Sequence, residues 1–323
     1  MDGVLMRGGK AIPGARKALE RLQGDNPKNK VIPFIVLTNS GGELEAEKAR
    51  KLSNILGIEV KDKQVLVSHS PMRELVPDYK DKLVHVVGPT HCKNVAHSYG
   101  FRRVITSHEL RNWNRSMWPF EVIGDHLSSA EATPFDLNVE PISAVMIMHD
   151  STDWGLDIQL ITDSLMSESG MLGTRQDAQR GAIKQGVPVF SSNPDFLWSN
   201  DWPLPRFGQG AFVRALDGVW RQLSGNPLNI AKQYGKPSAA TYDYAKHLLS
   251  QEIPGSLERV YMVGDNPKSD IAGANANGWV GVLVESGVYR KGDSLLESEK
   301  PKIITRDVLD AVDWILQNDE AYD

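Results

Sequence analysis

The stretch VYMVGDNPKSD, residues 260–270, begins as a short apolar run and ends in a charged turn. The run at residues 260–263 is typical of a buried strand, and Gly264 marks the turn that ends it. Behind the turn, Ser269 or Asp270 can cap a helix that runs through residues 271–274. The stretch therefore predicts a strand, a polar turn and a helix in succession.

The same succession occurs elsewhere in the chain. Apolar runs at residues 31–37 and 280–284 also read as buried strands. The first of these precedes a helical stripe made of Leu44, Ala49, Leu52, Ile55 and Leu56. Uninterrupted apolar strands that alternate with amphipathic helices predict an α/β fold, with a parallel sheet covered on both faces. Functional groups in such folds gather at the carboxyl ends of the strands.

A second α/β unit is expected in the middle of the chain. Residues 83–87, 103–105, 144–148 and 187–190 read as strands, and residues 156–165 as part of a helix. The stretch 112–138 has few periodic apolar residues and is expected to be a long loop. We therefore predict an inserted unit at residues 73–205 within a core made of residues 1–72 and 206–323.

Composition excludes several classes of protein. The 323 residues are 41% hydrophobic, which is ordinary for a globular chain. A net charge of −5, with no dense basic run, argues against nucleic acid as a partner. No apolar run approaches the roughly 20 residues of a membrane span. Cys92 is the only cysteine, which excludes an internal disulfide and fits a reducing compartment or a matrix.

Four polar clusters stand out, each at a predicted turn: Asp2-Gly3-Val4-Leu5, Thr38-Asn39-Ser40-Gly41-Gly42, Lys236-Pro237 and Gly264-Asp265-Asn266-Pro267-Lys268-Ser269-Asp270. Each has a plain structural interpretation, because Thr-Asn-Ser-Gly-Gly and Gly-Asp-Asn-Pro are good turns and helix caps. A lone Lys-Pro is usually a solvated lysine before a turn. The four clusters together nevertheless supply the groups that phosphoryl transfer needs.

A dianionic phosphate requires a cation, hydrogen-bond donors and a metal ion that offset the charge on its oxygens. We predict that Lys236 supplies the cation and that Thr38 and Asn39 supply donors at a helix N-terminus. Asp265 is a hard oxygen ligand suited to Mg²⁺, with Asp270 as a second ligand or an orienting group. Asp2 can protonate the leaving alcohol and then deprotonate the attacking water.

The order and spacing of these clusters resemble the haloacid dehalogenase phosphatase superfamily. Its four motifs are Asp-x-Asp-Gly-Val/Thr, a Thr/Ser often followed by Asn, a Lys, and Gly-Asp-x4-Asp. The last three are matched here by Thr38-Asn39, Lys236-Pro237 and Gly264-Asp265 with Asp270. The large insert resembles the type-2 cap of subfamily IIA, the NagD and p-nitrophenylphosphatase branch. The resemblance covers essentially the whole chain.

Asn193-Pro194-Asp195, near the end of the insert, resembles that branch's segment leading back to the core. Within the branch, Ser68-His69-Ser70-Pro71-Met72 and residues 206–212 resemble the mitochondrial cat-eye-syndrome-critical-region hydrolases and their fungal relatives. The resemblance implies a Rossmann-like core, a Mg²⁺-dependent phosphatase and a small phosphorylated metabolite, such as a glycerol phosphate, as substrate. It also implies substrate contacts from Asn193 and Asp195, a mitochondrial or else cytoplasmic location, and homodimers like those of capped relatives.

The first motif departs from the family pattern. Asp2-Gly3-Val4-Leu5 aligns with its second half, which makes Asp2 the acid/base and a further metal ligand and puts the nucleophilic Asp before Met1. We therefore expect the first core strand to be missing, a gap in the sheet and negligible phosphatase activity from these 323 residues. The alternative is a non-catalytic haloacid dehalogenase-like protein that binds a phosphate ligand or acts as a scaffold.

Three further patterns are interpreted as structural. Gly292-Asp293-Ser294-Leu295 matches the motif of GDSL esterases but lies in a charged C-terminal loop. Gly208-Gln209-Gly210 is only a fragment of a dinucleotide fingerprint. His91, Cys92 and His97 lack the spacing of a metal site, so packing or surface roles are expected.

Overall fold

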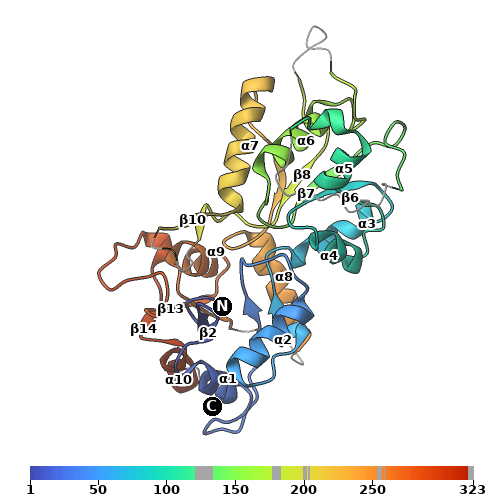
Figure 1. The fold of residues 1–323 in the computed structure, drawn as a ribbon. Coiled ribbons are helices and arrows are strands. Elements are labelled where there is room, and N and C mark those ends of the chain that lie inside the picture. The colour runs from blue at the N-terminus through green and yellow to red at the C-terminus, as the bar shows by residue number, and fades with distance from the viewer. Residues whose placement is uncertain are drawn as a thin grey trace. The chain divides into compact units, whose positions relative to one another are not determined.

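The chain forms two compact α/β units in a computed structural model, which describes residues 1–120, 134–176, 183–198, 202, 204–252, 257 and 259–318. Unit 1 comprises residues 1–40, 44–71 and 235–323, and unit 2 comprises residues 41–43 and 72–234. Figure 1 labels the elements of both units. The fold class is the predicted one, an α/β chain with parallel sheets and an inserted second unit.

Unit 1 contains two separate parallel sheets. Strand β12 (Tyr261–Gly264) pairs with β13 (Val280–Val284), which pairs with β14 (Ile303–Thr305). Strand β3 (Val36–Leu37) pairs with β4 (Val65–Leu66). Within the described part of the chain no strand joins β3 to β12, which leaves a gap between the two sheets.

Side chains bridge this gap on both faces. On one face, Leu37 and Leu66 share a buried cluster with Met262 from β12. On the other, Val36 and Val65 share a cluster with Val282 from β13. The strand predicted at residues 31–37 is limited to β3, at its carboxyl end. The preceding residues do not pair, because Val31 is exposed and Pro33 has no N–H group to donate to a neighbouring strand. The core of unit 1 is therefore continuous even though its backbone ladder is not.

The helices of unit 1 follow the predicted pattern with one correction. Helix α2 (Glu45–Leu56) buries Ala49, Leu52 and Leu56 of the predicted stripe. After β12 the chain forms a π-helical turn at Pro267–Ile271 and then α9 (Ala272–Ala276), capped by Asn266, whose side chain accepts from the N–H of Lys268. The predicted caps Ser269 and Asp270 lie inside this turn, because the turn already starts at Pro267.

The remaining elements of unit 1 enclose this core. Helix α1 (Ala15–Leu22) lies beside α10 (Val308–Asn318), as Figure 1 shows. Helix α8 (Ala239–Ser250) lies against α9. The short strands β1 (Met6–Arg7) and β2 (Lys10–Ala11) form a hairpin whose two turn residues are glycines with positive φ, as a type I′ turn requires.

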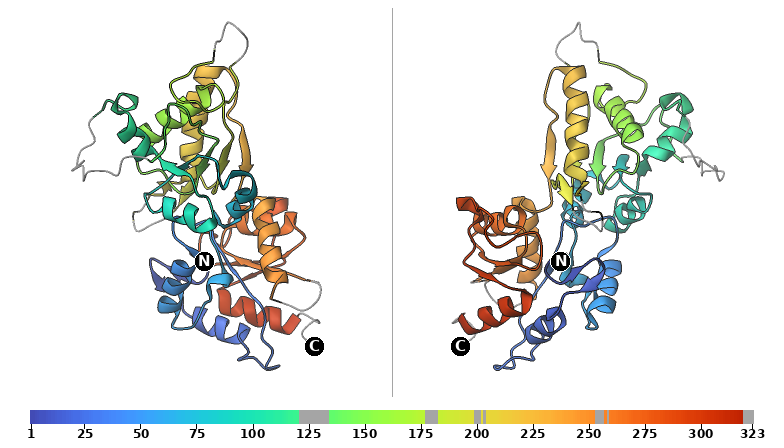
Figure 2. Two further views of the ribbon diagram at one scale, coloured as in Figure 1. Left: turned by 90° about the vertical axis from the view of Figure 1, so that its right-hand side faces the viewer. Right: turned by 60° about the vertical axis from the view of Figure 1, so that its left-hand side comes forward.

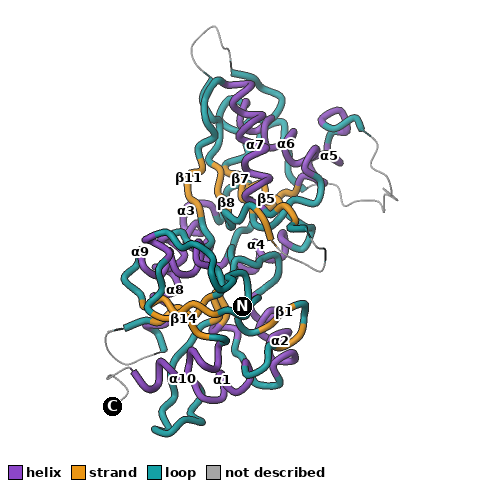
Figure 3. The backbone as a smooth tube through the Cα atoms, turned by 90° about the vertical axis from the view of Figure 1, so that its left-hand side faces the viewer, coloured by secondary structure: helices purple, strands orange, loops and turns teal. Residues whose placement is uncertain are grey.

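Unit 2 is built on one parallel sheet of five strands in the order β11-β8-β7-β5-β6. Figure 3 shows β11, β8, β7 and β5 side by side. The strands span Val84–Val87 (β5), Val104–Thr106 (β6), Ala144–Ile147 (β7), Val189–Ser191 (β8) and Ile230–Gln233 (β11). The first four were expected from their apolar runs, and β5 and β7 are buried throughout.

Helices flank this sheet, and a short hairpin completes unit 2. Phe212, Leu216 and Trp220 of α7 pack on side chains of the sheet and of α6, and Figure 2 shows α7 running along the strands. The helices span Val76–Tyr79 (α3), Cys92–Tyr99 (α4), Ser107–Trp113 (α5), Trp154–Met166 (α6) and Gln209–Ser224 (α7). The hairpin pairs β9 (Leu197–Trp198) with β10 (Arg206–Phe207).

The division between the units differs from the predicted boundary at one end. Residues 206–234 were assigned to the core but lie in unit 2. The reason is that α7 packs on the second sheet and β11 forms its edge, in parallel with β8. The predicted loop at residues 112–138 lies partly outside the described residues. No helix among the described residues is long and apolar enough to cross a membrane.

Candidate active site

A buried ion pair lies at the centre of the candidate site in unit 1. Lys236 Nζ donates to Asp270 Oδ1 at 2.6 Å, and both side chains are less than a tenth exposed. The same ammonium donates to the carbonyl of Leu37, at the end of β3, at 3.4 Å. The predicted third and fourth motifs therefore meet directly through Lys236 and Asp270. They do so next to β3, the strand that precedes the second motif.

Asp270 orients the turn that follows β12. Its second oxygen, Oδ2, accepts the main-chain N–H groups of Asp265 at 3.1 Å and Asn266 at 3.0 Å. Burial alone raises the pKa of Asp270, but the charge and hydrogen bond of Lys236 outweigh this and leave the pKa below its usual value. Both oxygens of Asp270 have protein partners, which favours an orienting role over that of a second metal ligand.

Asp265 is held by main-chain contacts from the loop after β13. Val288 N donates to Asp265 Oδ2 at 2.8 Å, and Tyr289 N donates to the main-chain oxygen of Asp265 at 3.0 Å. Burial and the neighbouring charge of Asp270 raise the pKa of the Asp265 carboxyl against the opposing influence of nearby positive charge. A carboxylate in such surroundings favours a bound cation.

Two glycines allow the backbone to approach Asp265 closely. A Cβ at Gly3 would lie 2.3 Å from Asp265 Oδ2, and one at Gly287 would lie 2.0 Å from it. Ser286 Oγ donates to the carbonyl of Gly3 at 2.7 Å, which fastens the N-terminal loop to the loop after β13. The glycine of the first predicted motif is therefore required by its contact with the fourth.

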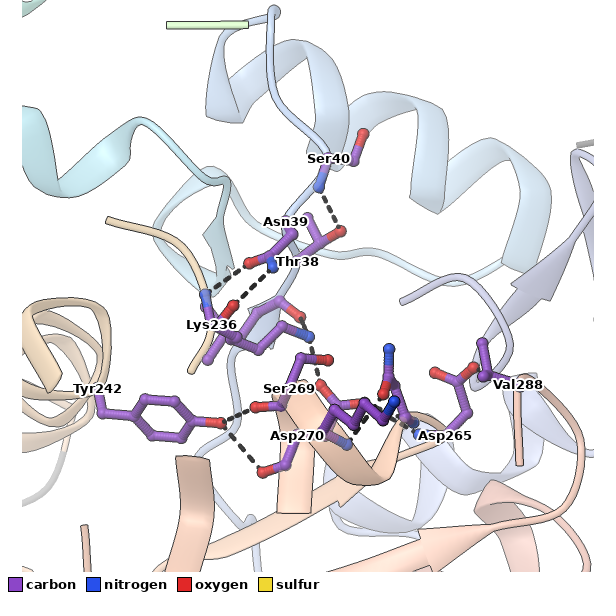
Figure 4. A network of polar contacts seen from close by, with 12 residues as sticks. Thr38, Asn39, Ser40, Lys236, Tyr242, Asp265, Ser269, Asp270 and Val288 are labelled. Atoms are coloured by element: carbon purple, nitrogen blue, oxygen red, sulfur yellow. Dashed lines mark hydrogen bonds and ion pairs between the residues drawn. The ribbon is translucent and has the colours of Figure 1, made fainter. Parts of the chain in front are cut away.

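Asn39 spans the main chain of Lys236, as Figure 4 shows. Its Nδ2 donates to the carbonyl of Lys236 at 3.0 Å, and its Oδ1 accepts the N–H of Lys236 at 2.7 Å. These contacts position the lysine, and the predicted donation from Asn39 to phosphate stays a prediction. The two residues are 197 positions apart in the sequence, so no local pattern reveals this pairing.

Thr38 follows β3 directly, at the carboxyl end of that strand. Its main-chain N–H donates to the carbonyl of Leu66, and its buried hydroxyl accepts the N–H of Ser40 at 3.1 Å. Since a hydroxyl has one hydrogen to donate besides the lone pairs that accept, Thr38 retains the chemistry of a phosphate donor. Figure 4 shows Thr38 next to Asn39 and Lys236.

Asp2 reaches the site less directly. Its side chain is exposed, while its main chain bridges to Met6. The α-amino group of Met1 is buried near Lys236, Asp265 and Asp270, and burial and then the Lys236 charge lower its pKa. No group of three or more side chains arranged to hold a metal is found in the described part of the chain.

The predicted residues Asn193 and Asp195 lie in unit 2, in the loop after β8. Asn193 Oδ1 accepts the N–H of Asp195 at 2.9 Å, and Asn193 N donates to Oε1 of the buried Gln209 at 2.7 Å. A Cβ at Gly208 or Gly210 would lie 2.6 or 2.3 Å from carbonyl oxygens of this loop. Gly208-Gln209-Gly210 therefore fastens the start of α7 to the loop, while the predicted substrate contacts of Asn193 and Asp195 stay a prediction.

Sequence patterns missed one residue of the site, Tyr242 on α8. Its hydroxyl donates to the main-chain oxygens of Ser269 and Asp270. An apolar helix stripe gives no sign of such a contact, because the tyrosine reads as an ordinary core residue there.

Cys92 lies outside this site, in unit 2. It is buried, as expected for a packing residue, and burial raises the pKa of its thiol to about 12.

Comparisons with known proteins agree with this geometry. The profile of haloacid dehalogenase-like hydrolases matches residues 1–102, and a second profile, HAD-hydrolase-like, matches residues 233–311. The mitochondrial hydrolase YKR070W of Saccharomyces cerevisiae is 38% identical over 98% of this chain and 94% of its own length. The chain belongs to the haloacid dehalogenase-like hydrolases. Within them it falls in subfamily IIA, as the resemblance of its insert predicted.

Solved structures share the fold at low sequence identity. The p-nitrophenyl phosphatase from Archaeoglobus fulgidus is 18% identical, with a TM-score of 0.66 over 97% of this chain and 96% of its own. The glycerol phosphate phosphatase of Mycobacterium tuberculosis, in complex with calcium, is 19% identical, with a TM-score of 0.64 over 96% of this chain and 72% of its own. At these identities the likeness establishes the fold.

Proposed function

We propose that this chain carries the phosphate and Mg²⁺ site of a phosphatase that hydrolyses small phosphate monoesters. The observation that carries the proposal is the buried cluster in which Lys236 contacts Asp270 and Asp270 holds the turn that bears Asp265. A cation, an oriented carboxylate and the hydroxyl of Thr38 meet at strand ends, where a phosphate group needs them.

Each residue of the cluster has a distinct task in this proposal. Lys236 neutralises charge on the phosphate oxygens, and Thr38 donates to one of them. Asn39 fixes the main chain of Lys236 from both sides, which keeps the ammonium aimed at the site. Asp270 orients the turn that bears Asp265. These tasks require rigid placement, which burial of Lys236 and Asp270 provides.

The residues present fit a magnesium ion. Mg²⁺ prefers hard oxygen ligands and is often held by one or two carboxylates together with water and substrate phosphate. The buried carboxylate of Asp265, closely approached by Gly3 and Gly287, supplies such a ligand. When bound, Mg²⁺ polarises the phosphoryl oxygens and offsets their negative charge.

The nucleophile is the remaining requirement. In a chain that carries the family's aspartate two positions before Asp2, we propose that this aspartate attacks phosphorus, forming a carboxyl–phosphate bond while the bond to the substrate alcohol breaks. Asp2 gives its proton to the departing alcohol and then takes one from the water that cleaves the aspartyl-phosphate.

Adding the missing groups tests the proposal. The 323-residue chain is expected to hydrolyse p-nitrophenyl phosphate negligibly. A version extended by an apolar strand and an Asp before Met1 is expected to gain Mg²⁺-dependent hydrolysis by several orders of magnitude. The matched control carries the same extension with Asn in place of that Asp.

The outcome separates the enzyme from its non-catalytic alternative. If the extended protein stays inert at saturating Mg²⁺ yet binds inorganic phosphate, the chain is a phosphate-binding protein and the phosphatase proposal fails. Glycerol phosphates are the first natural substrates to test, because a structural relative is described as a glycerol phosphate phosphatase.

A mitochondrial location is proposed from the yeast relative's description. A cap-mediated homodimer stays a prediction.

A further inference from the structure

The hydroxyl of Tyr242 holds the turn that carries Asp270. Its single hydrogen is shared between the main-chain oxygens of Ser269, at 3.0 Å, and Asp270, at 3.1 Å, both in the π-helical turn Pro267–Ile271. Figure 4 shows the ring of Tyr242 approaching this turn from the opposite side to Asp265. Widened turns of this kind are frequent at functional sites, where a side chain must be aimed accurately.

The position of Tyr242 is set by close packing. Its ring lies edge-on to Trp279 with centroids 5.0 Å apart, and it is almost completely buried. A Cβ at Gly273 would lie 2.3 Å from the tyrosine hydroxyl, so the helix start and the ring are in direct contact. Burial and the nearby charge of Asp270 raise the pKa of Tyr242, which keeps the hydroxyl protonated and able to donate.

A short path of contacts leads from this hydroxyl to the proposed metal ligand. Tyr242 holds the carbonyls of residues 269 and 270, and the carboxylate of Asp270 accepts the N–H groups of Asp265 and Asn266. Each step is a hydrogen bond between buried or half-buried groups. The direction of the Asp265 side chain therefore depends on the anchoring of the turn five residues later.

We propose that Tyr242 is a positioning residue of the metal site, whose hydroxyl fixes the 267–271 turn so that Asp265 is presented to a divalent cation. This inference rests on the proposed function, because it takes Asp265 to be a metal ligand. Tyr242 itself touches neither metal nor phosphate in this proposal. Partners that orient a ligand residue typically contribute about 10- to 100-fold to metal affinity.

Tyr242→Phe tests the inference, since it retains the ring and removes only the hydroxyl. The measurement is Mn²⁺ binding to the 323-residue chain by electron paramagnetic resonance, with Mg²⁺ as competitor. Mn²⁺ affinity is expected to fall about 10-fold or more. The matched control is Tyr244→Phe, because Tyr244 lies on the same helix, packs on the same cluster and makes no hydrogen bond with its hydroxyl among the described residues.

Asp265→Asn and the unfolding temperature complete the experiment. Asp265→Asn is expected to abolish specific Mn²⁺ binding. If Tyr242→Phe binds Mn²⁺ with wild-type affinity while Asp265→Asn does not bind it, the positioning role is overturned and the proposed function stands. A lower unfolding temperature of Tyr242→Phe at wild-type Mn²⁺ affinity would show that the hydroxyl contributes only to stability. Absence of Mn²⁺ binding to the wild type, or unchanged binding in Asp265→Asn, would overturn the metal site and the positioning role together.

Discussion

Single residues in the site are defined by their long-range partners. Lys236 and Asp270 form a buried pair, and Asn39 holds the main chain of the lysine. Exposed pairs elsewhere in unit 1, such as Lys63 with Glu252 at 2.7 Å, have the same chemistry in a solvated setting. The difference in burial gives the two lysines different expected contributions to the free energy of unfolding.

Lys236→Met is expected to destabilise the protein by about 3–5 kcal/mol, because it leaves the Asp270 carboxylate buried without its cation. Lys63→Met, the exposed control, is expected to cost at most about 1 kcal/mol. Urea unfolding of both variants measures the difference. In the double variant Lys236→Met/Asp270→Asn, part of the lost stability should return; equal effects of the two lysine variants would mean that the buried pair is not stabilising.

At the scale of elements, helix α7 has one glycine that packs tightly and one that does not. The start of the helix lies against the loop after β8, where Gly210 N donates to the carbonyl of Asp195 at 2.9 Å. Gly218, in the middle of the same helix, has open space where a Cβ would point. The same residue type therefore has opposite packing requirements at two positions of one helix.

Gly210→Ala is expected to destabilise the protein by about 1–3 kcal/mol, since its Cβ would lie 2.3 Å from the carbonyl oxygen of Pro194. Gly218→Ala is expected to be neutral or to stabilise by up to about 1 kcal/mol, because alanine has the higher helix propensity. Denaturant unfolding of the two variants checks both signs. A neutral Gly210→Ala would show that the loop after β8 yields to the helix at little cost.

At the scale of the whole molecule, a buried histidine makes the stability of unit 2 depend on pH. His85, in β5 of unit 2, is fully buried, and its Nε2 makes a 2.9 Å hydrogen bond with Ser107 Oγ. Its Nδ1 has no partner among the described residues. Burial lowers the pKa of His85 to about 3, so the folded state keeps this imidazole neutral far below the pH at which the unfolded chain protonates it.

Stability of unit 2 is therefore expected to fall as the pH drops below about 6.5, by up to about 1.4 kcal/mol per pH unit until the folded pKa is reached. His85→Asn should remove about 2 kcal/mol of the difference in stability between pH 7.5 and 5.0. Hydrogen exchange of β5 and β7 measures it, with the exposed His247→Asn as control. An unchanged pH dependence in His85→Asn would contradict this assignment.

The sequence by itself determined the identity and order of the motifs and the class of the fold. Strand, turn and helix follow from local periodicity and turn chemistry, which is why α2, β5 and β7 lie where they were expected. These features depend on neighbours within a few residues or on comparison with a known pattern.

Only the tertiary structure decided which side chains serve one another. Three contacts join distant segments of the chain: Asn39 binds the main chain of Lys236, Tyr242 binds the 267–271 turn, and Gly3 closely approaches Asp265. The assignment of residues 206–234 to unit 2 likewise follows from packing of α7 and pairing of β11. Periodicity reports which face of an element is buried, but the partner on that face is set by how the elements pack, which is a property of the folded chain.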